Sequence, residues 1–340
     1  MEWINTTFEK EMQRIIRERG NGLNHLIVDF ESIRNAMLTD NFFSEIKGTE
    51  PDLSDHSDRH IRDVLDKAYM IIGPEEFNKF HEYEIYCLAL MILFHDVGNI
   101  FGRIGHEAQA KIAEVYNKYR PHINYRAERR IILRGASAHA GTNKAGSKDT
   151  LRDLSNGDEN IDSIPIRLLE LAAILRFADE LAEGKQRTCT FLIDTGNYSA
   201  ESSIYHQYAE ITSIAPDRNM GRISITYDID ISNEFGEEER ENLKELLKFT
   251  YRRAYKLDEE RRYTKNYSSV LKAFKYVSIV YNFTRDGIPI DLDLKKIVFE
   301  DLYPIPGEVK EDIIESAEKL IVKKDDDYEI EKLISSLIIK

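Results

Sequence analysis

A histidine and an aspartate stand side by side where the most apolar stretch of the chain ends, in the segment MILFHDVGNIFGRIGHE at residues 91–107. If His95 and Asp96 are buried with that stretch, each of them needs a polar partner. Other polar residues lie on apolar helical faces or directly after one, namely His60, His139 and Asp179. Imidazole and carboxylate groups that meet in a core are ligands of divalent metal ions. The sequence therefore predicts a metal site.

Each of these side chains, taken alone, is more often a structural residue than a metal ligand. His60 shares a helical stripe with Val64 and Ala68, where a satisfied core histidine would also fit. The convergence of five such residues favours a shared metal site instead. His95 and Asp96 are also expected in the last turn of a helix, where the negative end of the helix dipole favours a cation.

Five helices are expected between Asp52 and Glu183, because apolar residues recur there at three- and four-residue spacing. Their predicted ranges are 54–72, 83–97, 106–119, 126–138 and 165–184. The polar segment 141–162, which is rich in turn-forming residues, is expected to be a long loop. The sequence thus predicts a compact helical bundle that can bring the polar residues together.

The sequence pattern changes after Gly184. Apolar and polar residues alternate in segments that are expected to be strands, at 188–194, 207–214, 221–231, 276–283 and 288–294. Amphipathic helices are expected at 237–257 and at 328–340. We therefore expect a mainly α fold in three parts: a helical extension over 1–51, the bundle over 52–184, and a C-terminal α+β domain over 185–340 that serves substrate binding, regulation or oligomerisation.

Acidic residues outnumber basic ones by 61 to 47, and the resulting net charge of -14 disfavours binding to long nucleic acids or anionic membranes. The chain has two cysteines, Cys87 and Cys189, so a disulfide framework is not expected. No basic start followed by an apolar core is visible near the N-terminus, and the longest apolar run, 85–94, is too short to span a bilayer. We expect a soluble, cytoplasmic protein.

The order His60, His95-Asp96, Asp179 resembles the HD superfamily of metal-dependent phosphohydrolases, which is named for its adjacent histidine and aspartate. The resemblance is carried by the segments DHSDRHIRDVL, LFHDVGN and ILRFADEL and covers residues 52–183. It implies an HD-type helical bundle as the fold of this part of the chain.

His106 in GRIGHE and His139 in ASAHAG are similar to the extra histidines of the branch that binds two metal ions. The resemblance implies that Asp96 bridges both ions and that the second ion is held by these two histidines. The ligands it implies for the first ion are His60, His95, Asp96 and Asp179. Manganese, iron, cobalt, nickel, zinc or magnesium would suit such ligands.

His56 lies one helical turn before His60, and it is a ligand, a partner of a ligand, a proton carrier or an ordinary polar residue. Many relatives have a lysine where this chain has Asn99, so another cation must contact a phosphate, or the substrate must differ. Asn99 itself is expected beside the ligands rather than among them.

Arg103 and Arg176 are the first choices for the phosphate-binding cation, because each lies three residues before an implied ligand. Each of them, taken alone, is more often a solvated surface charge. Glu107 could orient His106 or move protons, although such a residue more often faces solvent. Further candidates for substrate binding are Arg134, Lys144 and Lys185.

The implied reaction is hydrolysis of a phosphoester or phosphoanhydride bond by a metal-activated hydroxide, with His95, Asp96, Arg103, Glu107 and Arg176 as its catalytic residues. The expected substrate is a small nucleotide such as a (deoxy)nucleoside triphosphate. Two alternatives stay open. One is a phosphodiesterase or nuclease that acts on cyclic nucleotides, oligonucleotides or single-stranded ends, and the other is a nucleotide-sensing regulator with little turnover.

The segment YRRAYKLDEERRYTKNY at 251–267 has six basic residues and four tyrosines in an otherwise acidic chain. It could stack a base and bind phosphates, or it could be a helix whose tyrosines pack and whose charges are solvated. Together with the terminal helix it makes a homo-oligomer an expectation. A looser resemblance to HD proteins of bacterial defence and signalling operons implies an operon-encoded protein partner.

Overall fold

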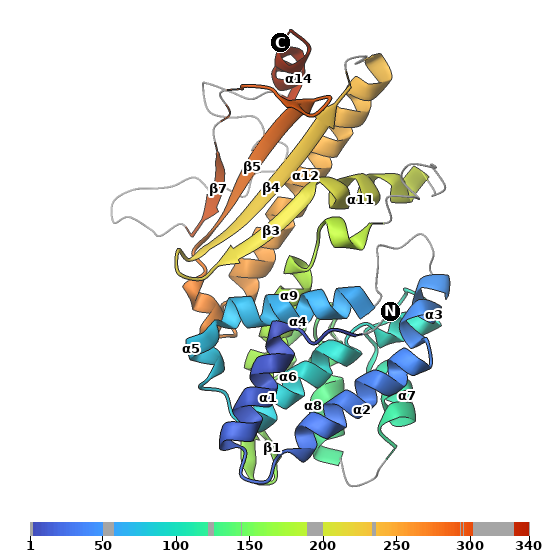
Figure 1. Ribbon diagram of the computed structural model, residues 1–340, viewed down its shortest axis with the longest axis vertical. Helices are drawn as coiled ribbons and strands as arrows, with labels where there is room; N and C mark the ends of the chain where they lie inside the picture. Colours follow the sequence, from blue (N-terminus) through green and yellow to red (C-terminus); the bar gives the residue numbers. More distant parts are fainter. Residues whose placement is uncertain are drawn as a thin grey trace. The chain divides into compact units, whose positions relative to one another are not determined.

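The computed structural model describes residues 3–49, 58–121, 126–143, 145–188, 200–232, 236–292, 294, 296–301 and 330–339. The chain forms two compact units. The first unit comprises Met1–Ala182 together with Tyr263–Ala273, and the second comprises Glu183–Arg262 together with Phe274–Lys340. The expected fold class, a helical bundle with an appended α+β region, is confirmed (Figure 1).

Helix α6, Glu82–Phe94, forms the centre of the first unit's core. All of its residues are buried, as expected for a helix that is apolar on every side. It begins with a capping box in which the Glu84 carboxylate accepts a hydrogen bond from the backbone N–H of His81. The window Glu82–Phe101 is long and apolar enough to cross a membrane, but 89% of it is buried within the fold, as in the core helix of a globular bundle.

The helices packed around α6 supply the remaining faces of the bundle (Figure 1). Their bounds are Thr7–Arg19 for α1, His25–Thr39 for α2, Asp58–Ile72 for α4, Arg126–Ser137 for α8 and Leu168–Leu181 for α9. Helix α8 approaches α6 closely, because a Cβ atom at Gly135 would lie 2.2 Å from Cε of Met91. Shorter or more peripheral helices are α3 (Phe42–Thr49), α5 (Pro74–Phe77) and α7 (Gln109–Tyr119).

The first unit departs from the predicted ranges where the chain turns toward the predicted ligands. The helix expected from residue 106 begins only at Gln109, because Ala108 is extended and His106 belongs to the preceding turn. The segment expected to be one long loop, 141–162, contains the short helix η3 (Leu151–Asp153) and strand β1 (Glu159–Ile161), which forms a hairpin with β2 (Ile164–Ile166) just beyond the segment. Strand β2 therefore occupies the predicted start of α9.

The second unit contains a five-stranded sheet with the order β3-β4-β5-β6, in which β7 also pairs with β5. The strand bounds are Thr212–Asp217, Arg222–Ile231, Tyr276–Arg285, Ile288–Pro289 and Ile297–Glu300 for β3 to β7. Strands β3 and β4 are antiparallel, and β4 and β5 are parallel. The 28-residue helix α12, Glu237–Thr264, packs against the sheet, where the hydroxyl of Tyr227 donates to the carbonyl of Thr250.

Two of the predicted strands of the second unit are corrected. The segment 207–214 begins as the end of helix α11 (Ala200–Ile211), and only its last residues enter β3. Its buried residues Tyr208, Ala209 and Thr212 follow helical spacing, which so short a window does not distinguish from alternation. Among the described residues of the segment 288–294, only Ile288–Pro289 (β6) is a strand, and the unpredicted strand β7 follows it.

The remaining predictions for the second unit concern its first strand, the end of its long helix and its terminal helix. Nearly all of the strand expected at 188–194 falls outside the described residues. Helix α12 extends seven residues beyond its predicted end at 257, and the terminal helix α14 covers Ile330–Ile339. Within α14, Ile334 and Leu337 are buried, and Arg285 donates a hydrogen bond to the Leu337 carbonyl. The apolar face of this helix therefore has a partner within the chain.

Candidate metal centre

Six side chains from separate elements of the first unit meet at one point, and we call them the His/Asp cluster. His60 comes from α4 and Asp179 from α9. His95 and Asp96 lie between α6 and the short helix η1, Val97–Phe101. His106 precedes α7, and His139 follows α8. The four histidines and Asp96 are buried, and the Asp179 side chain is 26% exposed.

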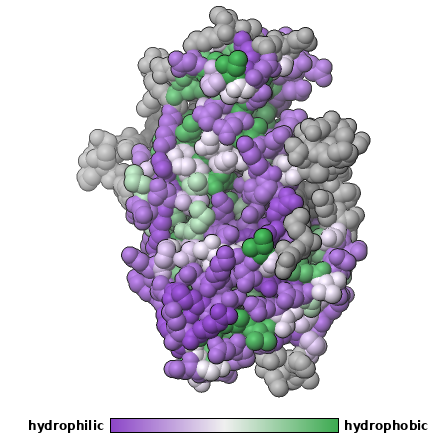
Figure 2. All heavy atoms as spheres, in the orientation of Figure 1, coloured by the Kyte–Doolittle hydropathy of each residue, from purple (hydrophilic) through white to green (hydrophobic). Residues whose placement is uncertain are grey.

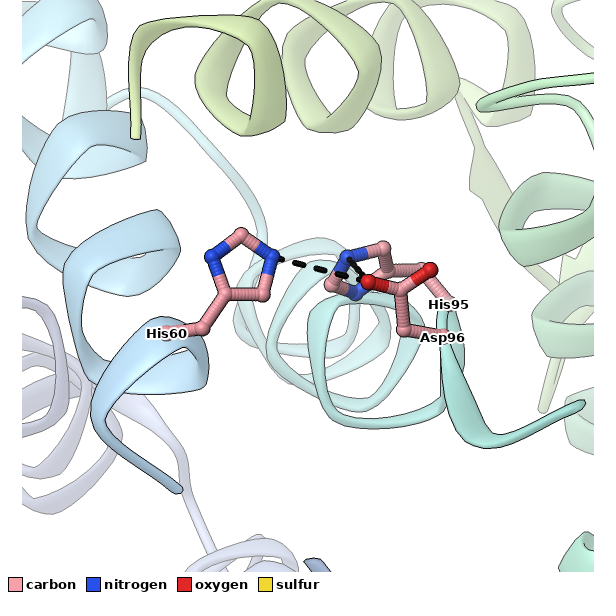
Figure 3. A group of neighbouring side chains, drawn as sticks. All are labelled: His60, His95 and Asp96. Atoms are coloured by element: carbon pink, nitrogen blue, oxygen red, sulfur yellow. Dashed lines mark ion pairs between the residues drawn. The ribbon is translucent and has the colours of Figure 1, made fainter. Parts of the chain in front are cut away.

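The carboxylate of Asp96 divides the histidines into two pairs. Its Oδ2 atom lies 3.2 Å from Nε2 of His95 and 3.6 Å from Nε2 of His60. Figure 3 shows these two imidazoles directed toward the same carboxylate oxygen. The Oδ1 atom lies 3.3 Å from Nε2 of His106 and 3.6 Å from Nε2 of His139. Each oxygen of one carboxylate thus faces its own pair of imidazoles.

Asp179 adds a second carboxylate to the first pair. Its Oδ1 atom lies 3.1 Å from Nε2 of His60 and 3.6 Å from Nε2 of His95. His60 and His95 therefore lie between two carboxylates. Of the two carboxylates in the cluster, His106 and His139 pair with Asp96 alone. The two halves of the cluster differ in negative charge.

Three of the histidines are held in the orientation that a metal ligand requires. In each of them the Nδ1 atom faces a backbone carbonyl oxygen three residues earlier. The Nδ1–O distance is 2.7 Å from His95 to Ile92, 2.6 Å from His139 to Ala136, and 3.1 Å from His106 to Arg103. An Nδ1–H group that donates to a carbonyl leaves the Nε2 lone pair free to face the centre. The same three-residue offset recurs in each case, since all three residues end or follow a helical turn.

Two glycines allow the loops of the cluster to approach each other. A Cβ atom at Gly98 would lie 1.9 Å from the carbonyl oxygen of His106, so only glycine permits this contact. Gly141 has a φ of +73°, and a Cβ atom there would lie 2.1 Å from Oε1 of Glu107. These positions bring the turns that carry His106 and His139 against their neighbours.

The electrostatics of the cluster fit a divalent cation. Burial alone would lower the pKa of His95, but Asp96 and Asp179 outweigh this effect and raise it to about 10. Burial would raise the pKa of Asp179, but the adjacent imidazoles of His60 and His95 hold it well below its ordinary value. Within the described part of the chain, Nε2 of His95 is buried and has no hydrogen-bond partner. Such a buried, negatively surrounded nitrogen favours a positive ligand.

The ligand atoms are also close enough to share ions. Three groups of cluster residues each offer atoms that lie within 4.8 Å of one another. The groups are His60 with His95 and Asp96, His95 with His139 and Asp179, and Asp96 with His106 and His139. Imidazole nitrogen and carboxylate oxygen in such groups can bind a divalent metal ion.

Three further residues predicted from the sequence surround His106. Oε2 of Glu107 lies 3.3 Å from Nδ1 of His106. Arg103 is exposed, and its guanidinium donates to Oδ1 of the buried Asn99 at 3.5 Å. Asn99 and Asp96 are three residues apart at the start of a 3-10 helix, so their side chains lie on the same side of it.

Arg176 and Arg134 already have partners within the bundle. The guanidinium of Arg176 donates to Oγ1 of Thr150 at 2.9 Å and lies 4.6 Å from the centre of the Tyr263 ring. Arg134 forms an ion pair with the buried Glu159 at 2.5 Å. The Glu159 carboxylate, which also pairs with Arg130, thus holds the Arg134 guanidinium in place.

The remaining predicted residues lie elsewhere or are not described. Lys185 belongs to the second unit, where its Nζ atom lies 3.9 Å from a carboxylate oxygen of Asp228. His56 and Lys144 fall outside the described residues.

Thr150 and Tyr263 are residues near the cluster that sequence reasoning missed. Tyr263 belongs to the basic, tyrosine-rich segment 251–267, for which both base stacking and internal packing were considered. The hydroxyls of Tyr263 and Tyr267 both donate to Asp149, and Tyr251 packs edge-on against Phe299. These three contacts favour packing. No local pattern marks Thr150, because its role depends on contacts with distant parts of the chain.

Comparison with known proteins gives one family match. The family model described as HD-CE matches residues 50–259. This range includes all six residues of the His/Asp cluster and ends before Tyr263. No curated protein and no solved structure matches the chain.

Proposed function

The chain belongs to the HD-CE family, and from this premise we propose that it is a metal-dependent phosphohydrolase whose His/Asp cluster binds two divalent ions. The observation that carries the proposal is the division of the Asp96 carboxylate between two pairs of histidines. A carboxylate with each oxygen facing a separate pair of imidazole nitrogens is suited to bridge two cations.

The residues assigned to the two ions are unequal in number. His60, His95 and Asp179 would hold the first ion with one oxygen of Asp96. The second ion would be held by the other oxygen of Asp96 together with His106 and His139. The second ion has fewer protein ligands, so we propose that it binds more weakly and keeps positions open for substrate.

A bound pair of divalent ions would lower the pKa of a water molecule and stabilise charge on phosphate oxygens. The chain's own residues would orient the substrate and move the proton. Arg103 is exposed on the loop that carries His106, and its guanidinium is suited to a phosphate oxygen. Glu107 contacts His106 and would accept or hold a proton near the second half of the cluster.

A small nucleotide is the proposed substrate class. Phe101 is 44% exposed and Ile104 is 93% exposed, and they flank Arg103 in the sequence. Apolar surface beside a guanidinium would complement a base or sugar joined to a phosphate. The net charge of -14 opposes a long polyanion and supports a small substrate instead.

The proposal is tested by the release of phosphate, pyrophosphate and triphosphate from a panel of ribonucleotides and deoxynucleotides, cyclic dinucleotides and short single strands, with manganese. The parent is compared with Asp96→Asn and His95→Ala, and His25→Ala serves as a control because His25 is an exposed histidine of α2. Metal-dependent release from a mononucleotide that is lost only in the cluster variants would support the proposal. The absence of metal-dependent turnover on the whole panel would refute it.

A further inference from the structure

The last two residues of helix α12 and the residues that follow them return to the first unit, which carries the His/Asp cluster. The segment Tyr263–Ala273 belongs to the first unit. The Glu170 carboxylate of α9 holds this segment by accepting hydrogen bonds from the hydroxyl and the backbone N–H of Ser269 at 2.8 and 3.0 Å. The segment is therefore anchored on the same helix that carries Asp179.

Tyr263 makes three contacts with residues around the cluster. Its hydroxyl donates to Oδ1 of Asp149 at 2.9 Å and accepts from the backbone N–H of Leu151 at 3.1 Å. The face of its ring lies under the guanidinium of Arg176, 4.6 Å from the ring centre. One tyrosine thus contacts both the 149–151 loop and helix α9.

Thr150 connects these contacts to His139. Its buried hydroxyl accepts from the guanidinium of Arg176 at 2.9 Å and donates to the carbonyl oxygen of Ala138 at 2.6 Å. Ala138 directly precedes His139, whose imidazole is held by the Ala136 carbonyl in the same turn. A continuous set of contacts therefore runs from Tyr263 through Arg176 and Thr150 to the backbone of His139.

Arg176 also belongs to the helix that carries Asp179. Arg176 lies three residues before Asp179 on α9, so the two side chains project from the same side of the helix. If the guanidinium lost its place on the tyrosine ring, the turn that carries Asp179 and the bond to Thr150 would both lose a support.

We propose that Tyr263 is a positioning residue of the metal centre: it fixes Arg176 and the 149–151 loop, and through them His139 and Asp179. The inference rests on the proposed function only in that the His/Asp cluster binds a divalent metal. Residues that hold metal ligands in place typically contribute about 10- to 100-fold to metal affinity. Tyr263 lies beyond the range of the family match, which ends at residue 259.

Tyr267 provides a matched control. Its hydroxyl donates to the same Asp149 oxygen at 2.8 Å, but its ring packs edge-on against Tyr263 and not under the guanidinium of Arg176. Removal of the Tyr267 hydroxyl therefore disturbs the same loop carboxylate and leaves the Arg176 contact in place.

The test measures cobalt binding to the full chain by calorimetry, together with the visible absorption spectrum of the bound Co²⁺. The variants are Tyr263→Leu, which removes the ring and the hydroxyl, Tyr263→Phe, which keeps the ring, and Tyr267→Phe. We expect Tyr263→Leu to weaken binding by about 10-fold and to change the spectrum. Tyr263→Phe should have a smaller effect, and Tyr267→Phe should match the parent.

Thr150→Val and Thr150→Ser keep the test decisive if Tyr263→Leu does not fold. The valine variant removes the hydroxyl that joins Arg176 to Ala138, and it should change the Co²⁺ spectrum, whereas the serine variant should restore it. Parent-like affinity and spectra in Tyr263→Leu, or in Thr150→Val, would overturn the proposal. Phosphohydrolase activity is measured separately on the parent, so metal binding without turnover would refute the proposed function and leave the positioning role standing.

Discussion

The Oδ1 atom of Asp96 lies 3.3 Å from Nε2 of His106, and it is the oxygen that does not face His60 and His95. One carboxylate at the end of the core helix therefore contacts two groups of imidazoles that arrive from different parts of the bundle. Because Asp96 follows a fully buried helix, its side chain is held more rigidly than a side chain on a loop would be.

Asp96→Asn should disable both halves of the cluster. The amide keeps the shape of the side chain but replaces one charged oxygen with an N–H donor, which repels a cation. We expect bound metal to fall from two ions to one or none per chain and turnover to fall at least about 100-fold. Metal content by elemental analysis and turnover rates check this prediction. Asp158→Asn, at an exposed aspartate of the same unit, should behave like the parent.

Metal binding should release protons. Because the pKa of His95 is raised to about 10 in the metal-free protein, this imidazole is protonated at neutral pH and must lose its proton to become a ligand. Calorimetric titration with zinc at pH 7.5, in two buffers of different ionisation enthalpy, should show about one proton released per chain. Equal heats in both buffers would contradict the assignment of His95 as a protonated ligand.

The metal-free protein should lose stability as the pH rises. The pKa of His95 is raised from its ordinary value of 6.5 to about 10, so its protonation stabilises the folded state fully below pH 6.5. This contribution decreases above pH 6.5 and is lost as the pH passes through about 10. Calorimetric Tm values of the chelator-treated protein should fall across this window, and His95→Gln should show a shallower decline. Parallel curves for the parent and the variant would exclude the effect.

Gly98→Ala should affect the second half of the cluster more than the first. The new Cβ atom would lie 1.9 Å from the His106 carbonyl oxygen, so the turn that carries His106 must move. We expect a loss of about 1–3 kcal/mol in the free energy of unfolding and weaker binding of one ion. Denaturant unfolding and metal titration test this. Gly236→Ala is the control, because its Cβ atom would first meet the flexible end of Glu239.

Arg103 and Arg134 should separate into a functional and a structural residue. Arg103→Ala should reduce kcat/KM by about 100-fold with unchanged stability, because its exposed guanidinium is proposed to contact phosphate. Arg134→Ala should keep its activity but lower the free energy of unfolding by about 1–3 kcal/mol, because Glu159 is buried and loses one of its two arginine partners. A loss of activity in Arg134→Ala with parent-like activity in Arg103→Ala would contradict this assignment. Steady-state kinetics and chemical unfolding distinguish the two.

Helical periodicity was sufficient to predict the convergence of five residues, since His60 and Asp179 lie on apolar stripes that must face the core. His106 was assigned through the family resemblance, because it lies in a turn where no periodic pattern exists. The strand predicted at 207–214 was partly wrong, because the short apolar pattern of this segment fits a helix as well as a strand. The contacts of Tyr263 with Asp149 and Arg176 could not be predicted, because they join residues that are far apart in sequence and carry no local signal.

The return of the chain to the first unit at Tyr263 has a consequence for biosynthesis. All six residues of the His/Asp cluster leave the ribosome before the second unit does, yet Tyr263–Ala273 follows most of that unit. At typical elongation rates of about 5–20 residues per second, about 4–17 s separate the synthesis of Asp179 from that of Tyr263. During this interval the nascent bundle lacks its last segment, and a metal ion that arrives early meets a centre whose His139 and Asp179 still lack the support of Tyr263.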